Sequence, residues 1–307
     1  MKIVLFCEQK YAINILYPLQ EEASAQSGNE VLWYIHKKNI ADFPLKDQIQ
    51  WTNSIQKVYD FNPEVIFVPC NIVPYYLPGV KIQIFHGYAA EKKDHWVIRR
   101  YFDLYLTQGP YFTKRFSTLA QKYKDFEVVE TGWPKQDWIA THLHDFDEEK
   151  KCLLRKYKKE KLVLYAPTFS PSMTSLPHIK EGLVKLTKEK DILLLLKFHP
   201  LTRPEWIEEY KTLAQQEENI LWIDDHDITK YELMADVMIS DTSSTVYEVL
   251  LLNKPVITYN TIAKAIYWLN ITDINQLSQA FEAVQKDEEW LLKRQWIIDN
   301  YDPYLDG

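Results

Sequence analysis

The stretch from Val237 to Glu248 contains the residue types that bind phosphate. It reads Val-Met-Ile-Ser-Asp-Thr-Ser-Ser-Thr-Val-Tyr-Glu, and an apolar helical pattern starts at Val246. We expect a strand, a tight turn and a helix start, where backbone N–H groups and hydroxyls meet the positive end of the helix dipole. Such a turn suits a phosphate or pyrophosphate. The same composition is typical of an ordinary helix N-cap, so the stretch alone leaves both interpretations open.

Two histidines directly follow apolar runs. His86-Gly87 comes after Ile84-Phe85, and His199 comes after a second run, with Lys197 two residues earlier. Histidine titrates near neutral pH and suits a general base, while glycine allows a close approach of backbone. For each motif taken alone, a structural histidine at a strand end is the alternative.

These positions share one property, which is that each lies just after a predicted strand. Thr168 follows Pro167, which ends another apolar run, and the turn Asp241–Thr245 follows the run from Val237. Carboxyl ends of parallel strands meet at one edge of a doubly wound sheet. We therefore expect His86, Thr168, His199 and the turn to converge on one cleft.

Short apolar runs alternate with amphipathic segments along the whole chain, which is typical of α/β proteins with buried parallel strands. We expect two doubly wound domains with a cleft between them, residues 1–150 and 151–307, divided in the charged helix-like stretch 145–161. The runs that predict strands are Ile3–Phe6, Val31–Ile35, Val65–Val68, Ile82–Phe85, Leu104–Thr107, Val128–Val129, Leu162–Ala166, Ile192–Phe198, Ile220–Ile223, Val237–Ile239 and Val256–Tyr259.

Composition narrows the class of protein. The chain has 307 residues, enough for two domains, and a formal net charge of −7, which argues against nucleic-acid binding. Its three cysteines are widely spaced and give neither a disulfide framework nor a zinc pattern. The amino terminus enters a strand-like run at once, and no apolar stretch is long enough to cross a bilayer. We therefore expect a cytoplasmic protein.

Taken together, the motifs resemble the CDP-glycerol glycerophosphotransferases of teichoic acid and capsule synthesis. These proteins look like GT-B glycosyltransferases with two Rossmann-like domains, so the resemblance implies a GT-B-like fold. The order and spacing of the matches cover about the last two-thirds of the chain. The matching segments are His86-Gly87, Thr131–Asp137, Tyr165–Thr168, His199-Pro200, Asp236–Glu248 and Lys254–Ile257.

The resemblance implies roles for individual residues. His86 would be the general base and His199 a second essential histidine near the donor phosphates. The donor-binding residues would be Gly87, Thr168, Lys197, Asp241, Ser243, Ser244, Thr245 and Glu248. The hydroxyls of Ser243 to Thr245 would hold the pyrophosphate, and Glu248 would face the ribose.

The reaction implied is direct displacement. An acceptor hydroxyl on a polymer or lipid-linked acceptor would attack the phosphorus nearer the polyol of a CDP-linked donor and expel CMP. Positioning and charge neutralisation would supply most of the catalysis. We expect neither a cofactor nor a bound metal ion, and we expect contact with the inner face of the plasma membrane.

This chain departs from the family pattern at several places. Relatives usually carry a lysine at the position of Glu91 and an arginine at the position of Ser170, and they commonly continue beyond Gly307 through an arginine-bearing helix. These departures fall at positions that the resemblance assigns to binding the donor. A GT-B glycosyltransferase using a UDP- or CMP-linked sugar is therefore an alternative, and a non-catalytic nucleotide-sugar-binding protein is another.

Three further features have both a functional and a structural interpretation. Asp224–Asp227 could bind a metal or form a solvated loop that caps a helix. The basic run within 150–161 could rest on anionic lipid or form a charged helix between domains. Trp96, Tyr101 and Tyr105 could line an acceptor groove or fill a core. We favour the structural interpretation of the first two.

Overall fold

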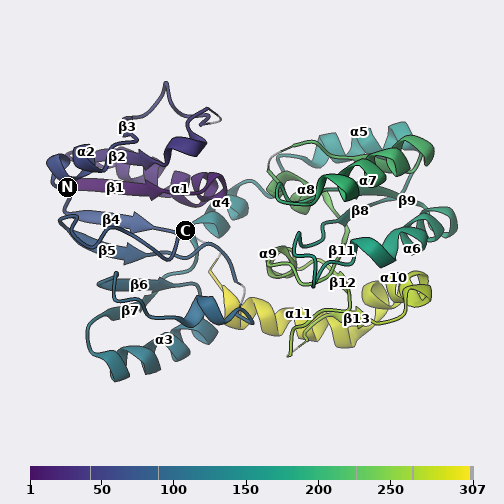
Figure 1. Cartoon of the computed structure of the whole chain (residues 1–307). Helices are drawn as coiled ribbons and strands as arrows, with labels where there is room; N and C mark the ends of the chain where they lie inside the picture. Colours follow the sequence, from purple (N-terminus) through teal and green to yellow (C-terminus); the bar gives the residue numbers. More distant parts are fainter. Residues whose placement is uncertain (42, 89, 226, 265, 305–307) are drawn as a thin grey trace. The chain divides into compact units, whose positions relative to one another are not determined.

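The computed structural model describes the chain except for residues 42, 89, 226, 265 and 305–307 (Figure 1). The described residues form two compact units, each with its own parallel sheet. The units are Met1–His86 with Lys92–His142 and the C-terminal residues from Asn300 (unit 1), and Gly87–Glu91 with Leu143–Asp299 (unit 2).

Unit 1 contains a seven-stranded parallel sheet in the order β3-β2-β1-β4-β5-β6-β7. This is the Rossmann order, in which the strand order reverses between β1 and β4. The strands are β1 Lys2–Cys7, β2 Glu30–Ile35, β3 Trp51–Thr52, β4 Val65–Val68, β5 Val80–Gln83, β6 Leu104–Thr107 and β7 Glu127–Glu130.

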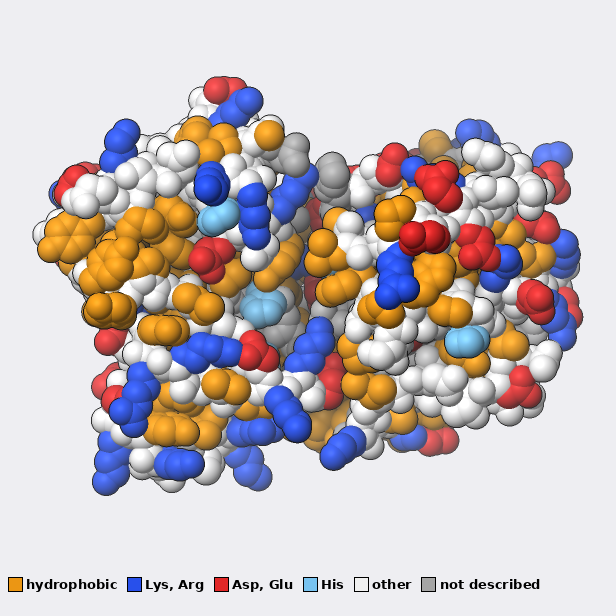
Figure 2. Space-filling model, viewed as in Figure 1, with side chains coloured by type: hydrophobic (Ala, Val, Ile, Leu, Met, Phe, Trp, Pro, Cys, Tyr) orange, Lys and Arg blue, Asp and Glu red, His pale blue; other side chains and the backbone are white. Residues whose placement is uncertain are grey.

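Helices cover only part of this sheet. Helix α1 packs against β1 and β2, and α3 packs against β6 and β7. The connection 69–79 between β4 and β5 forms no helix and exposes Ile72, Tyr75 and Tyr76, and Figure 2 shows hydrophobic side chains gathered over this part of unit 1. The helices are α1 Ile13–Ala25, α2 Ile55–Phe61, α3 Pro110–Tyr123 and α4 Pro134–Thr141, with short 3-10 turns at η1 Lys10–Ala12, η2 Lys37–Asn39 and η3 Lys93–Trp96.

Unit 2 repeats the same plan. Its six parallel strands lie in the order β10-β9-β8-β11-β12-β13, so the switch point falls between β8 and β11. The strands are β8 Lys161–Tyr165, β9 Ile192–Leu196, β10 Ile220–Trp222, β11 Val237–Ser240, β12 Val256–Tyr259 and β13 Leu269–Ile271. The predicted α/β class, with two doubly wound Rossmann-like sheets, is confirmed.

The core of unit 2 explains why its strands read as continuous apolar runs. Every residue of β9 and β11 is buried, because helices cover both faces of a parallel sheet. The helices are α5 Asp147–Tyr157, α6 Leu176–Glu189, α7 Pro204–Gln216, α8 Thr229–Met234, α9 Thr245–Leu251, α10 Leu277–Lys286 and α11 Glu288–Tyr301, with a 3-10 turn at η4 Ile274–Gln276.

Each predicted strand coincides with or overlaps an observed one, but several predicted ends lie too far along the chain. Ile192–Phe198 runs two residues past β9, and Leu162–Ala166 and Ile220–Ile223 each run one residue past β8 and β10. The run Ile82–Phe85 was predicted as strand, whereas β5 ends at Gln83. Phe85 has φ 61°, a left-handed conformation that cannot continue a strand, and its apolar side chain is buried for another reason, described below. The short strands β3 and β13 were not predicted.

The close packing of α6 on η4 gives a stability test. A Cβ on Gly182 would lie 2.7 Å from Ile274 Cδ1 and closer still to its Cγ1. We expect Gly182→Ala to lower the free energy of unfolding by about 1–3 kcal/mol through overpacking. In an Ile274→Ala background the same change should instead stabilise by up to about 1 kcal/mol, through helix propensity. Urea denaturation measures both, and equal destabilisation in the two backgrounds would contradict the packing argument.

Candidate active site

A buried carboxylate ties together the loops that follow β8 and β11. Asp241 is fully buried, and its Oδ1 accepts hydrogen bonds from the backbone N–H groups of Thr168 and Thr242 at 2.8 and 2.7 Å. Its Oδ2 accepts from the backbone N–H and the hydroxyl of Ser175, both at 2.8 Å. Burial raises the pKa of Asp241, and these hydrogen bonds act in the opposite direction. Asp241 therefore positions the Thr168 loop across the switch point of unit 2.

The hydroxyl turn lies directly after Asp241 and remains partly accessible. Ser243, Ser244 and Thr245 are half-buried, and the hydroxyls of Ser243 and Thr245 lie 2.9 Å apart. Ser244 is the N-cap residue of α9, but its side chain makes no capping hydrogen bond. Glu248 lies one turn along α9 and is buried. The turn thus lacks the side-chain bond that defines an ordinary N-cap.

Lys197 places a cation just beyond β9. Its side chain is buried, and its Nζ donates to the carbonyl of Phe198 at 3.3 Å. Burial lowers the pKa of Lys197, whereas the carboxylates of the 224–227 loop, led by Asp225, raise it. The acidic loop thus favours the charged form of this lysine.

His199 stands at the rim next to the Thr168 loop. Its ring lies 4.4 Å from that of Phe169, the residue after Thr168. Its Nδ1 accepts the backbone N–H of Leu201 at 3.1 Å, so in the neutral ring the proton lies on Nε2. His199 therefore presents a hydrogen-bond donor at Nε2. The structure brings it together with Thr168 in unit 2.

His86 belongs to unit 1 and has the opposite tautomer. Its Nδ1 lies 3.1 Å from the carbonyl oxygen of Pro69, which can only accept, so Nδ1 carries the proton and Nε2 carries a lone pair. His86 is exposed at the surface, yet the protein packed around its ring lowers its pKa, although the bond to Pro69 acts in the opposite direction. The residue before it, Phe85, adopts the strained left-handed conformation noted above. This geometry suits a general base that is neutral at pH 7.

The residues that follow His86 pack within unit 2. A Cβ on Gly87, which has φ 144°, would lie 3.9 Å from Ser244 Cβ. Glu91 accepts a hydrogen bond from the hydroxyl of Tyr247 on α9 at 3.0 Å. Glu91, at the position where the resemblance leads us to expect a lysine, is thus a bonded partner of α9.

The acidic loop 224–227 behaves as a helix cap. Asp227 Oδ1 accepts from the backbone N–H and the hydroxyl of Thr229 at 3.0 and 2.8 Å, and Asp225 accepts from the hydroxyl of Tyr231 at 3.2 Å. His226 lies outside the described residues. Within the part of the chain that the structure describes, no group of metal-ligating side chains forms.

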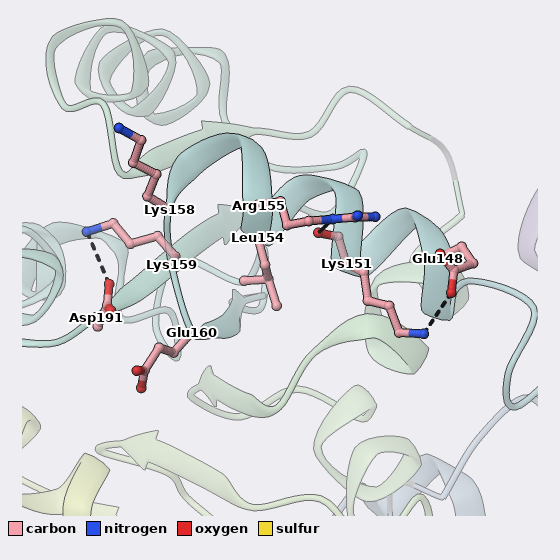
Figure 3. A pocket seen from close by; sticks show the side chains of 8 residues that line it. All are labelled: Glu148, Lys151, Leu154, Arg155, Lys158, Lys159, Glu160 and Asp191. Atoms are coloured by element: carbon pink, nitrogen blue, oxygen red, sulfur yellow. Dashed lines mark hydrogen bonds and ion pairs between the residues drawn. The ribbon is translucent and has the colours of Figure 1, made fainter.

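The basic run begins on α5, continues to the start of β8, and is partly paired with acidic residues. Lys151 pairs with Glu148 at 2.7 Å, and Lys159 pairs with Asp191 at 3.7 Å. Figure 3 shows these pairs around a shallow pocket of about 530 Å³, whose lining carries both charges. Such pairing weakens the attraction for anionic lipid. Among the described residues, no helix is long and apolar enough to cross a membrane.

The aromatic residues of unit 1 fall mainly in its core. Trp96 and Tyr105 are buried, and both lie within 5.3 Å of the Phe116 ring, measured between centroids. Tyr101 is half-buried. The core interpretation therefore holds for Trp96 and Tyr105.

Comparison with known proteins identifies the family. The sequence model described as CDP-Glycerol:Poly(glycerophosphate) glycerophosphotransferase matches residues 73–267, which include His86, His199 and the hydroxyl turn. The chain belongs to this family. The predicted resemblance is thus confirmed, and the chain is an enzyme of the transferase class.

Relatives and solved structures agree with this assignment. The chain is 25% identical to the teichoic acid glycerol-phosphate primase of Bacillus subtilis (strain 168) over 82% of this chain and 68% of the relative. It is 26% identical to the teichoic acid ribitol-phosphate primase of Bacillus spizizenii, over 63% of this chain and 54% of that protein. It is also 24% identical to the Bacillus spizizenii teichoic acid poly(glycerol phosphate) polymerase, spanning 46% of its length.

The solved structures show the fold. The wall teichoic acid polymerase TagF superposes with a TM-score of 0.72 at 18% identity, covering 99% of this chain and 85% of that one. The S. aureus MnaA–UDP structure superposes with a TM-score of 0.71 at 14% identity, covering 100% of this chain and 93% of the other. The glycerophosphotransferase chain thus has the expected GT-B-like architecture.

Two partners that shape the candidate site were not predicted from the sequence. Ser175 supplies two of the bonds to Asp241, and Tyr247 holds Glu91. Ser175 precedes Leu176-Pro177, a pattern typical of a helix start, which is the signal that could have singled it out. The link between Tyr247 and Glu91 has no local sequence signal.

The Asp241 network predicts a large effect of a small change. In Asp241→Asn, an amide N–H group would face buried donors, so we expect a loss of about 1–3 kcal/mol in the free energy of unfolding. Amide hydrogen exchange in residues 168–175 should become faster in the same variant. Asp273→Asn is the control, because this exposed carboxylate caps η4 through a single oxygen, and it should change stability by about 0.5 kcal/mol or less. Equal stability of Asp241→Asn and wild type would remove the positioning role.

Proposed function

We propose that this chain moves glycerol phosphate, or a similar polyol phosphate, from a CDP-linked donor to a hydroxyl of a polymer or lipid-linked acceptor in cell-surface polymer synthesis. The observation that carries the proposal is the family match over 73–267, because it spans both histidines and the hydroxyl turn. The chain spans about half the length of several of its relatives, so donor and acceptor are part of the proposal.

His86 would act as the general base. Its Nε2 lone pair takes the proton of the acceptor hydroxyl as the acceptor oxygen bonds to the phosphorus nearer the polyol. The bond from that phosphorus to the bridging oxygen breaks, and CMP leaves with the electron pair. The lowered pKa of His86 favours this role, because the ring is neutral at pH 7.

Unit 2 would bind the donor. The hydroxyls of Ser243, Ser244 and Thr245 can donate to pyrophosphate oxygens, and His199 Nε2–H is a further donor. Lys197 would add positive charge from the adjacent strand end. These groups would neutralise the negative charge of the phosphates without covalent chemistry, as phosphoryl transfer requires. Asp241 would position the Thr168 loop beside them.

The second candidate is a glycosyltransferase that uses a UDP- or CMP-linked sugar. It is favoured by the substitutions Glu91 and Ser170 on the donor side, which remove cations that the resemblance leads us to expect. In that reaction the same base would direct the acceptor hydroxyl to an anomeric carbon. Either reaction would take place in the cytoplasm, at the inner face of the plasma membrane if the acceptor is lipid-linked.

Nucleotide preference separates these candidates. Calorimetric titration with CDP, CMP, UDP and GDP, with and without magnesium, should show selective binding of CDP, since the donor would be CDP-linked. Transfer from CDP-glycerol and CDP-ribitol would then be assayed. Preference for UDP or CMP would support the glycosyltransferase, and binding of nucleotide without any transfer would indicate a binding protein.

Substitution of His86 tests the proposed base. His86→Gln should lower kcat by about 10²–10⁴-fold while nucleotide affinity stays unchanged. The wild-type profile of kcat/KM should lose activity on its acid side below pH 6.5, since protein surroundings hold the pKa of His86 below that value. His178→Gln, at an exposed position on α6, is the matched control. Equal losses of nucleotide binding and turnover would assign His86 a structural role.

A further inference from the structure

The C-terminal residues from Asn300, which include the end of α11, are built into unit 1. The Tyr301 ring stacks on Tyr111 with centroids 4.9 Å apart and planes at 19°. A Cβ on Gly109 would lie 2.5 Å from the carbonyl oxygen of Tyr301, so the backbone of this segment passes where no side chain could fit. Tyr304 donates its hydroxyl to Glu130 on β7 at 2.6 Å. The segment is held at both ends.

Asp302, between these anchors, bonds to the start of α4. Its side chain is 1% exposed, and its Oδ2 accepts the backbone N–H of Trp133 at 3.1 Å. Its Oδ1 lies 3.4 Å from the backbone N–H of Tyr304 and 3.3 Å from where a Cβ on Gly132 would stand. A carboxylate at this place is favourable, because the N-terminus of an α-helix carries a partial positive charge.

Trp133 connects this carboxylate to the residue before His86. Its side chain is 1% exposed, and its indole Nε1 donates to the carbonyl oxygen of Phe85 at 3.4 Å. Phe85 is the residue with φ 61°, a conformation that persists only where the surroundings hold it. Its ring is held too, stacked on His95 at 5.1 Å and packed on Phe116 at 5.0 Å. The indole of Trp133 thus fixes the carbonyl of Phe85, and the rings of His95 and Phe116 fix the Phe85 side chain.

We propose that Asp302 is a positioning residue for His86, acting through Trp133 and the carbonyl of Phe85. The inference rests on the proposed role of His86 as the base. A shift of Phe85 would move the His86 ring away from the carbonyl of Pro69. The hydrogen bond to that carbonyl sets which ring nitrogen can take the proton of the acceptor substrate. A displacement of about 1 Å at such a group can lower a rate about 10²-fold.

The first test reads His86 itself in the substrate-free protein. Nitrogen-15 NMR of the imidazole gives its tautomer and its pKa, with the His86 signals assigned by their loss in His86→Gln. In wild type we expect the proton on Nδ1 and a pKa below 6.5. Asp302→Ala should mix the tautomers and move the pKa toward 6.5. The pKa of His86 also depends on the nearby charged groups Lys92 and Asp94, and His86 interacts with His95. All three residues therefore stay unchanged in the variants compared.

Matched variants separate positioning from general damage. Asp302→Asn keeps an oxygen for the Trp133 N–H and should restore much of the wild-type His86 spectrum. Asp299→Asn changes an exposed carboxylate nearby on α11, bonded to Gln295, and should change nothing. If Asp302→Ala does not fold, Trp133 replaced by benzothienylalanine removes the N–H while keeping the ring shape, and it should give the same spectral change.

Kinetics complete the test. With a CDP-linked donor, Asp302→Ala should lower kcat about 10²-fold while the affinity for nucleotide stays within error. A folded Asp302→Ala or benzothienylalanine protein whose His86 tautomer and pKa match wild type would overturn the positioning role. The NMR result does not depend on substrate. If His86 responds but no CDP-linked donor reacts, the proposed function fails while the link from Asp302 to His86 stands.

Discussion

One buried carboxylate holds the candidate donor site of unit 2 in place. Removing Asp241 from water is costly, and the structure offsets that cost with four hydrogen bonds, three of them from backbone N–H groups. Those donors come from the loops after β8 and β11, which flank the switch point of the sheet. The hydroxyl turn from Ser243 and the rim position of Thr168 depend on this contact. Asp241 therefore shapes the loops on which the candidate donor site depends.

The fold was largely predictable because parallel strands are buried on both faces. Runs such as Ile192–Leu196 contain no polar residue, so the succession of strands and helices along the chain could be predicted from apolar periodicity. The edge strands β3 and β13 gave no such signal, since β3 has two residues and β13 is half-buried. The other two edge strands, β7 and β10, carry enough apolar residues to be predicted. Phe85 misled the prediction because its apolar side chain serves an aromatic cluster and not the sheet. Local sequence cannot distinguish those two reasons for burial.

The sequence indicated which strand precedes each candidate histidine, but not the chemical state of its ring. His86 and His199 both follow strands, as their sequence neighbours indicated. The structure gives them opposite neutral tautomers, because Nδ1 of His86 donates to a carbonyl while Nδ1 of His199 accepts an N–H. One ring therefore offers a lone pair at Nε2 and the other offers a proton. Backbone partners from other loops decide this, and a one-dimensional pattern contains no record of them.

One departure from the family pattern has a structural role of its own. Glu91 is bonded to Tyr247 on α9. At Ser170 the described hydrogen bonds come from the backbone carbonyl, which accepts from Met173 and Thr174 and does not depend on the side chain. Neither position supplies a cation, so charge neutralisation in the proposed reaction relies on Lys197, whose protonated form the acidic loop 224–227 favours. In the proposed reaction, a loop that resembled a metal site would thus act indirectly, through the pKa of a neighbouring lysine.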